Sequence, residues 1–119
     1  MDDYKVTLRK LAVRDDHFVR TLLSEERSNA ELSGIDAKSH ALVRIAALIA
    51  MDAAPPSYMS AVEAGLDAGA SYEEIVGTLI AVLPVVGAAR VVSAAPNLGL
   101  ALGYDVAAAL ELVEGNQQR

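Results

Sequence analysis

The 119-residue sequence contains no cysteine and no tryptophan, and it has little positive charge. The lack of cysteine excludes disulfides, thiolate nucleophiles, cysteine metal sites and thiol redox relays. Lys and Arg number 10 against 16 Asp and Glu, which gives a formal net charge of -6 and no basic cluster. Because phosphate neutralisation needs clustered cations, we expect no nucleic-acid partner.

Aromatic residues are also scarce, with four tyrosines and one phenylalanine. Ala, Leu, Val and Ile must therefore build the core, and side chains of this size let helices approach closely. Since 53% of the residues are hydrophobic and the chain is short, we expect one globular domain over residues 1–119.

The longest apolar region, Ile75–Tyr104, contains a single charged residue, Arg90, and is interrupted by Pro84 and Pro96. A spanning helix needs about 20 apolar residues, so we expect buried or interfacial helices and no membrane partner. Residues 1–6 are acidic and lack the apolar stretch of a secretory signal, which predicts a cytoplasmic location.

No segment alternates as a strand does, and the helical period predicts an all-α fold of about six helices. Residues 1–14 show no clean period and are expected to form an extended or short helical arm. The expected helices are a segment capped by Asp15 or Asp16 and running to about Leu32, then Ala37–Met51, Pro56–Ala68, Tyr72 to about Pro84, Gly87–Leu102 with a bend or split near Pro96, and a short last helix from Asp105 to about Glu114.

Local signals define several of these boundaries. Ser33-Gly34 ends the first helix, and Pro55-Pro56 ends the second and starts the third. Gly69 fits a left-handed C-cap, and Ser71-Tyr-Glu-Glu74 is a capping box. Residues 45–51 are all uncharged, so this half of the second helix is expected to be buried nearly all round.

Three segments, IDAKSHALVRIAALIA (35–50), AVEAGLDAGASYEEIVGTL (61–79) and VVGAARVVSAAPNLGLALGYD (85–105), together resemble the carboxymuconolactone decarboxylase family, which includes the alkylhydroperoxidase D-like proteins. The middle segment is the most specific, and the resemblance covers roughly residues 33–105, after an N-terminal arm and helix in residues 1–32. It implies a compact all-helical subunit that works as a homo-oligomer, commonly a trimer or a hexamer built from trimers, with sites at or near subunit interfaces.

In the peroxidase branch of this family, a Cys-x-x-Cys-x-x-x-His motif precedes the conserved turn. Its positions fall here on Ala54, Ser57 and Ala61, and an assisting glutamate falls near Ala41 or Leu42. A thiol relay needs a thiolate, so we expect no alkylhydroperoxidase activity. The reaction of the decarboxylase branch needs cationic groups that hold the substrate carboxylates, and an acid or base for proton transfer. The histidine that members of this branch usually carry would also fall at Ala61.

Arg90 is the strongest candidate site residue, because a lone cation in an apolar run is costly unless it is paired. It either clamps a ligand carboxylate or pairs with an acidic residue across a helix or subunit contact. His40 lies on the same side of its predicted helix as Asp36 and Arg44. It is either a general base that Asp36 orients or part of an exposed polar face.

Tyr58 either places its hydroxyl in a pocket or belongs to the core, and Asp52 is a loop-end carboxylate with a functional or a turn role. His17 is expected at the surface. The two histidines show no metal-ligand spacing, so neither a metal nor another cofactor is expected.

The leading hypothesis is a cofactor-free lyase or isomerase acting on a small carboxylate, with Arg90, His40, Arg44 and Tyr58 at its site. The alternatives are a non-catalytic oligomeric scaffold and a small-molecule binder that kept the fold and lost the chemistry.

Overall fold

The computed structural model describes residues 3–117 and is all-helical, which confirms the predicted class. Within this range the chain forms eight helices rather than about six: α1 (Tyr4–Ala12), α2 (Asp16–Ser24), α3 (Glu26–Ser33), α4 (Ala37–Met51), α5 (Pro55–Asp67), α6 (Tyr72–Val86), α7 (Ala88–Ala101) and α8 (Val106–Gln117). The chain divides into an N-terminal unit, Met1–Asp36, and a C-terminal unit, Ala37–Arg119. The boundary lies close to residue 33, where the family resemblance begins.

The N-terminal unit contains the two additional helices. Part of the expected arm forms α1, and the helix expected to run to Leu32 is broken at Glu25, whose backbone is extended at φ -141°. The Asn29 amide donates to the Leu22 carbonyl at 3.2 Å, which satisfies an acceptor at the end of α2. No described residue of this unit is fully buried, so by itself it has no closed core.

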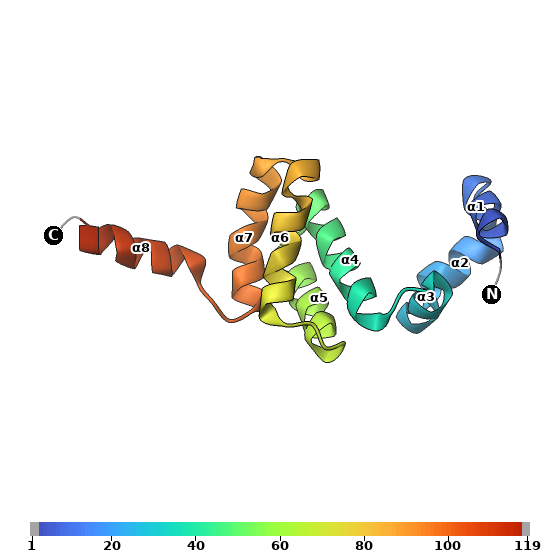
Figure 1. Ribbon diagram of the computed structural model, residues 1–119, viewed down its shortest axis with the longest axis horizontal. Coiled ribbons are helices and arrows are strands. Elements are labelled where there is room, and N and C mark those ends of the chain that lie inside the picture. The colour runs from blue at the N-terminus through green and yellow to red at the C-terminus, as the bar shows by residue number, and fades with distance from the viewer. Residues whose placement is uncertain (1–2, 118–119) are drawn as a thin grey trace. The chain divides into compact units, whose positions relative to one another are not determined.

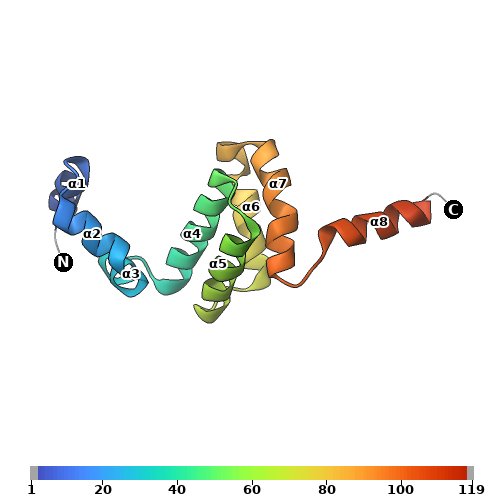
Figure 2. The ribbon, with the colours of Figure 1, turned by 180° about the vertical axis from the view of Figure 1, so that it is seen from behind.

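In the C-terminal unit, α4, α5, α6 and α7 form a four-helix bundle. Contacts join α4 to α5 and α6, and α7 to α5 and α6, so α4 and α7 occupy opposite corners. Figure 1 shows α6 between α7 and α4, and Figure 2 shows α5 on the other side of the bundle.

The core of this bundle takes large side chains from all four helices. Tyr58, the largest, is fully buried. The other buried core residues are Ile45 and Ile49 from α4, Val62 from α5, Ile75 and Leu79 from α6, Ala94 and Leu98 from α7, and Ala70 from the α5–α6 connection. Aliphatic side chains thus supply most of the core, as the composition predicts.

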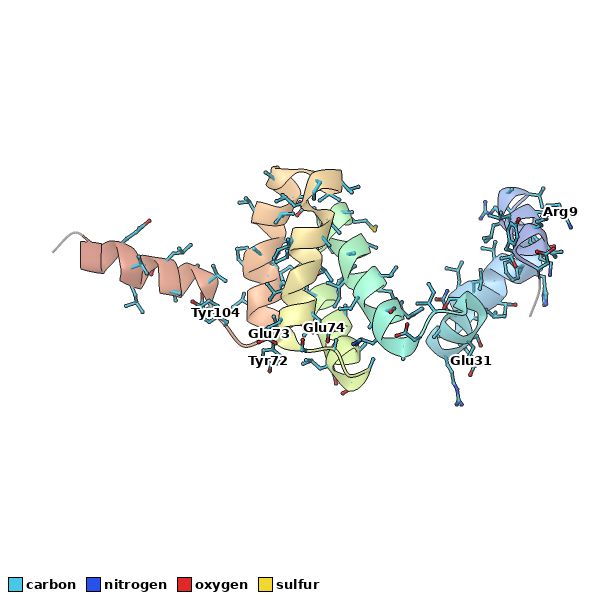
Figure 3. The ribbon with its side chains drawn as sticks, in the orientation of Figure 1. Arg9, Glu31, Tyr72, Glu73, Glu74 and Tyr104 are labelled. Carbon is cyan, nitrogen blue, oxygen red and sulfur yellow. The ribbon has the colours of Figure 1, made fainter. Side chains whose placement is uncertain are left out.

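The predicted signals around the start of α6 are confirmed. Gly69 has a positive φ of +93°, and Ser71 and Glu74 form the capping box through two reciprocal hydrogen bonds of 2.9 and 3.0 Å. Figure 3 shows Glu74 at the beginning of α6. The Ser71 backbone bond and the Lys38 ammonium, 2.9 Å away, lower the pKa of Glu74.

The two prolines expected to end, bend or split helices do not interrupt them. Pro84 lies inside α6, which continues to Val86, and Pro96 lies inside α7, which is continuous to Ala101. Pro84 cannot donate to the Ile80 carbonyl, so α6 lacks one helical hydrogen bond there and still extends two residues further.

The expectation that the second half of α4 is buried nearly all round is wrong for the chain by itself. Ile45 and Ile49 are fully buried, whereas Ala47, Ala50 and Met51 are exposed. α4 therefore has an apolar outer side that the bundle does not cover.

Candidate functional site

The polar cluster of the bundle is centred on Asp52, directly after α4. Its φ of +54° is left-handed, a conformation that Asp adopts more readily than most residues. The carboxylate reaches α7, where the Ser93 hydroxyl donates to Oδ1 at 2.7 Å and Arg90 Nη1 lies 3.6 Å from Oδ2. Asp52 therefore ties the α4–α5 connection to α7.

Arg90 lies near the start of α7 and is half-exposed, with 48% of its side chain accessible. Of the two roles considered for this lone cation, the geometry within one chain matches the ion pair with an acidic residue. The 3.6 Å separation is longer than the about 2.8 Å typical of charge-assisted hydrogen bonds. Because both groups are close to half-exposed, water screens their attraction.

Tyr58 lies in the core beside this cluster, and its hydroxyl does not line a cavity. The hydroxyl donates to the Leu48 carbonyl at 3.2 Å, and the same carbonyl accepts from the Ala53 N–H at 3.1 Å. Burial raises the pKa of Tyr58 above its ordinary value of 10.0, and the negative charge of Asp52 raises it further. The phenol is thus held neutral and hydrogen-bonded, in a packing role.

His40 and Arg44 lie on the first half of α4, away from Asp52. His40 is partly buried and Arg44 is exposed. At about 1.5 Å per residue, they stand roughly 18 and 12 Å from Asp52 along the helix axis. The structure therefore brings Tyr58 and Arg90 to one place and leaves His40 and Arg44 at another.

Ser93 is the member of the cluster that sequence reasoning did not single out. It lies three residues after Arg90 on the same side of α7, a spacing that places two side chains over one spot. This i, i+3 spacing from Arg90 is the sequence feature that could have identified Ser93. Asp52 was considered, but nothing local indicated its partners.

His17 and Phe18 line an open depression of about 410 Å³ in the N-terminal unit, together with Lys10, Asp15, Thr21 and Leu32. The Lys10 ammonium lies 5.2 Å from the Phe18 ring centre, a cation–π contact across this depression. His17 is exposed, in agreement with the surface position expected for it.

Residues 3–117 bring no three His, Asp or Glu side chains together as metal ligands would be. In the same range, no helix is long and apolar enough to cross a membrane. No protein-family model, curated protein or solved structure matches the chain. The family resemblance therefore stays a prediction based on the three sequence segments.

Proposed function

We propose that this chain is a self-associating helical protein, similar to the carboxymuconolactone decarboxylase family, that functions as an oligomeric scaffold. The resemblance supports a trimer or a hexamer built from trimers. Its fold would be retained for subunit contacts, without the reactive residues that relatives carry.

The observation that carries this proposal is that α6 is apolar on two sides. One side contributes Ile75 and Leu79 to the core. Another forms what we call the α6 stripe, namely Tyr72, Val76, Ile80 and Leu83, which lie within roughly 80° of one another around the helix. Ile80 is 72% exposed, and no residue from Ile75 through Ala89 is charged. Exposed apolar surface of this kind marks an interaction site.

The geometry within one chain gives little support to catalysis. Ala54, Ser57 and Ala61, which stand where relatives carry reactive side chains, have no titratable group. The space between the bundle helices is filled by core side chains, and the ring of Tyr58 is among them. Arg90 already has an acidic partner, Asp52, within its own chain.

Light scattering after size-exclusion chromatography tests the proposal, with an expected mass of a trimer or hexamer of the 12.5 kDa chain. Ile80→Glu places a charge in the α6 stripe and should weaken association by about 100-fold or more, since an unpaired buried charge costs about 3 kcal/mol or more. Ser60→Glu adds the same charge on the exposed side of α5 and should leave the mass unchanged. A monomeric wild-type chain at high concentration would overturn the proposal.

A second candidate, a lyase or isomerase acting on a small carboxylate, is favoured by the way Arg90 and Ser93 converge on a carboxylate. The Asp52 side chain occupies the place that a ligand carboxylate would take, and its contact with Arg90 is long. A ligand that displaced it would gain a bidentate arginine contact.

Thermal unfolding with small dicarboxylates tests this candidate, because a ligand of the folded state raises the melting temperature. The expected shift should vanish in Arg90→Gln and persist in Arg44→Gln, which removes a cation distant from Asp52. Equal shifts in both variants would indicate non-specific anion binding and rule out this site.

A further inference from the structure

The connection from α7 to α8 is closely packed. The Tyr104 N–H donates to the Gly99 carbonyl at 2.8 Å, and Gly103 has a φ of +87°. A Cβ on Gly99 would lie 2.8 Å from a methyl group of Val106 and 2.9 Å from the Tyr104 carbonyl oxygen. These contacts fix the beginning of α8 against the end of α7.

Beyond this connection, the apolar side of α8 is uncovered. Val106, Leu110 and Val113 share one side of the helix and are called the α8 stripe. Val106 is partly buried at the connection, but Leu110 is 58% and Val113 51% exposed. An isolated helix of this length is marginal in water, so α8 needs a surface to pack on.

The packed connection places the beginning of α8 on α7, and in the described part of the chain α8 does not pack on α6. A movement of α8 back over its own α6 would have to loosen the contact between Val106 and Gly99. A surface outside the chain's own bundle is therefore favoured as the cover of the α8 stripe.

Charge indicates what kind of surface this is. The polar side of α8 carries Glu111 and Glu114, and residues 106–117 contain neither Lys nor Arg. An anionic membrane or a nucleic acid would repel this helix. The α6 stripe of a second copy has no charged neighbour along α6 from Ile75 onwards. Along the helix axis this stripe is roughly 16 Å long, and the α8 stripe is roughly 10 Å long.

The two ends of α6 differ in charge. Glu73 stands at its beginning beside Glu74, which is paired with Lys38, whereas Arg90, just after its end, is paired with Asp52. The second half of α8, which carries Glu111 and Glu114, is therefore repelled from the beginning of α6 and not from its end. A second copy of this chain thus offers an uncharged apolar surface and a distribution of charge that sets the orientation of α8 on it.

We propose that α8 is an exchanged arm, whose stripe packs on the α6 stripe of a second copy of the chain. The inference rests on the proposed self-association and names the element responsible for it. The contact is compatible with a mutual exchange in a dimer and with a head-to-tail ring that closes as a trimer.

Because the chain has no cysteine, engineered single cysteines report this contact directly. A chain with Ile80→Cys is mixed with a chain carrying Val113→Cys and oxidised mildly. We expect disulfide-linked heterodimers to form about tenfold or more faster than with the control pair Ser60→Cys and Val113→Cys, because assembly raises the effective concentration of the two thiols. Ser60 lies on α5, diagonally across the bundle from α6.

Equal rates for the two pairs would overturn the proposal. So would a double variant, Ile80→Cys with Val113→Cys in one chain, that forms its disulfide within a monomer. That outcome would show that α8 covers its own α6.

A matched pair on α8 separates this inference from the proposed function. Leu110→Glu should weaken association by about 100-fold, whereas Leu112→Glu, which lies off the α8 stripe and is 72% exposed, should not. If the wild-type chain associates and Leu110→Glu leaves the mass unchanged, arm exchange fails and self-association stands. If the wild-type chain is monomeric, both fail.

Discussion

At the scale of single residues, Asp52 combines an unusual backbone conformation with contacts to two side chains of α7. Sequence reasoning established that Arg90 needs a partner, from the cost of a lone cation in an apolar segment. It did not identify that partner. Asp52 and Ser93 are 41 residues apart and meet only through the packing of the four-helix bundle, which no local pattern encodes.

Substitution of Asp52 separates backbone strain from charge. Asp52→Asn tolerates the left-handed backbone and still accepts from Ser93, so it should cost less than about 1 kcal/mol of unfolding free energy. Asp52→Ala adds strain at the positive φ and leaves Ser93 without its acceptor, so it should cost roughly 1–3 kcal/mol. Urea unfolding measures both, and an equal loss in the two variants would show that charge dominates.

Tyr58 predicts a pH dependence of stability. Its pKa in the folded chain is raised above the ordinary value of 10.0, so its contribution is complete below pH 10 and is lost as the pH rises towards the folded pKa. Tyr58→Phe should remove this alkaline loss. At neutral pH it should cost only about 0.5–1.5 kcal/mol, because the Leu48 carbonyl keeps its bond from Ala53.

Unfolding in urea between pH 8 and pH 11, with Tyr4→Phe as the control at an exposed tyrosine, checks this prediction. An unchanged alkaline slope in Tyr58→Phe would contradict it.

At the scale of helices, the boundaries that depend on neighbouring residues were predictable. The Ser71–Glu74 box, the Gly69 C-cap and the Asp105 cap, whose Oδ1 accepts from the Ala108 N–H at 3.0 Å, each act within four residues. Neither Pro84 nor Pro96 ends its helix, because tertiary packing outweighs the loss of one helical hydrogen bond. The break at Glu25 is accompanied by a hydrogen bond from the Asn29 amide to the Leu22 carbonyl, seven residues earlier, which the pattern of a single helical turn does not indicate.

The α7–α8 connection predicts opposite effects for two glycines. Gly99→Ala must push against the Tyr104 carbonyl as well as Val106, so it should destabilise the chain by about 1–3 kcal/mol. Gly115→Ala meets open space within α8 and should stabilise that helix by up to about 1 kcal/mol. Thermal unfolding followed by circular dichroism distinguishes them, and a neutral Gly99→Ala would show that the connection is loose.

At the scale of the whole molecule, all the fully buried residues among those described belong to the C-terminal unit. A fragment of residues 37–119 should therefore fold cooperatively, with a urea midpoint within about 15% of that of the full chain. Chain concentrations must be matched, because association contributes to apparent stability. A fragment without a cooperative transition would show that the bundle depends on residues 1–36.

Tyr58 also allows the packing of the bundle core to be followed by circular dichroism. Without tryptophan, near-ultraviolet circular dichroism comes from the tyrosines and Phe18, and Tyr58 is the aromatic residue held rigidly in the bundle. The far-ultraviolet signal instead sums all the helices, α1–α3 included. If the two spectra are recorded during one thermal scan, any gap between their midpoints measures how far the melting of the helices outside the bundle, α1–α3 and α8, is uncoupled from that of the bundle.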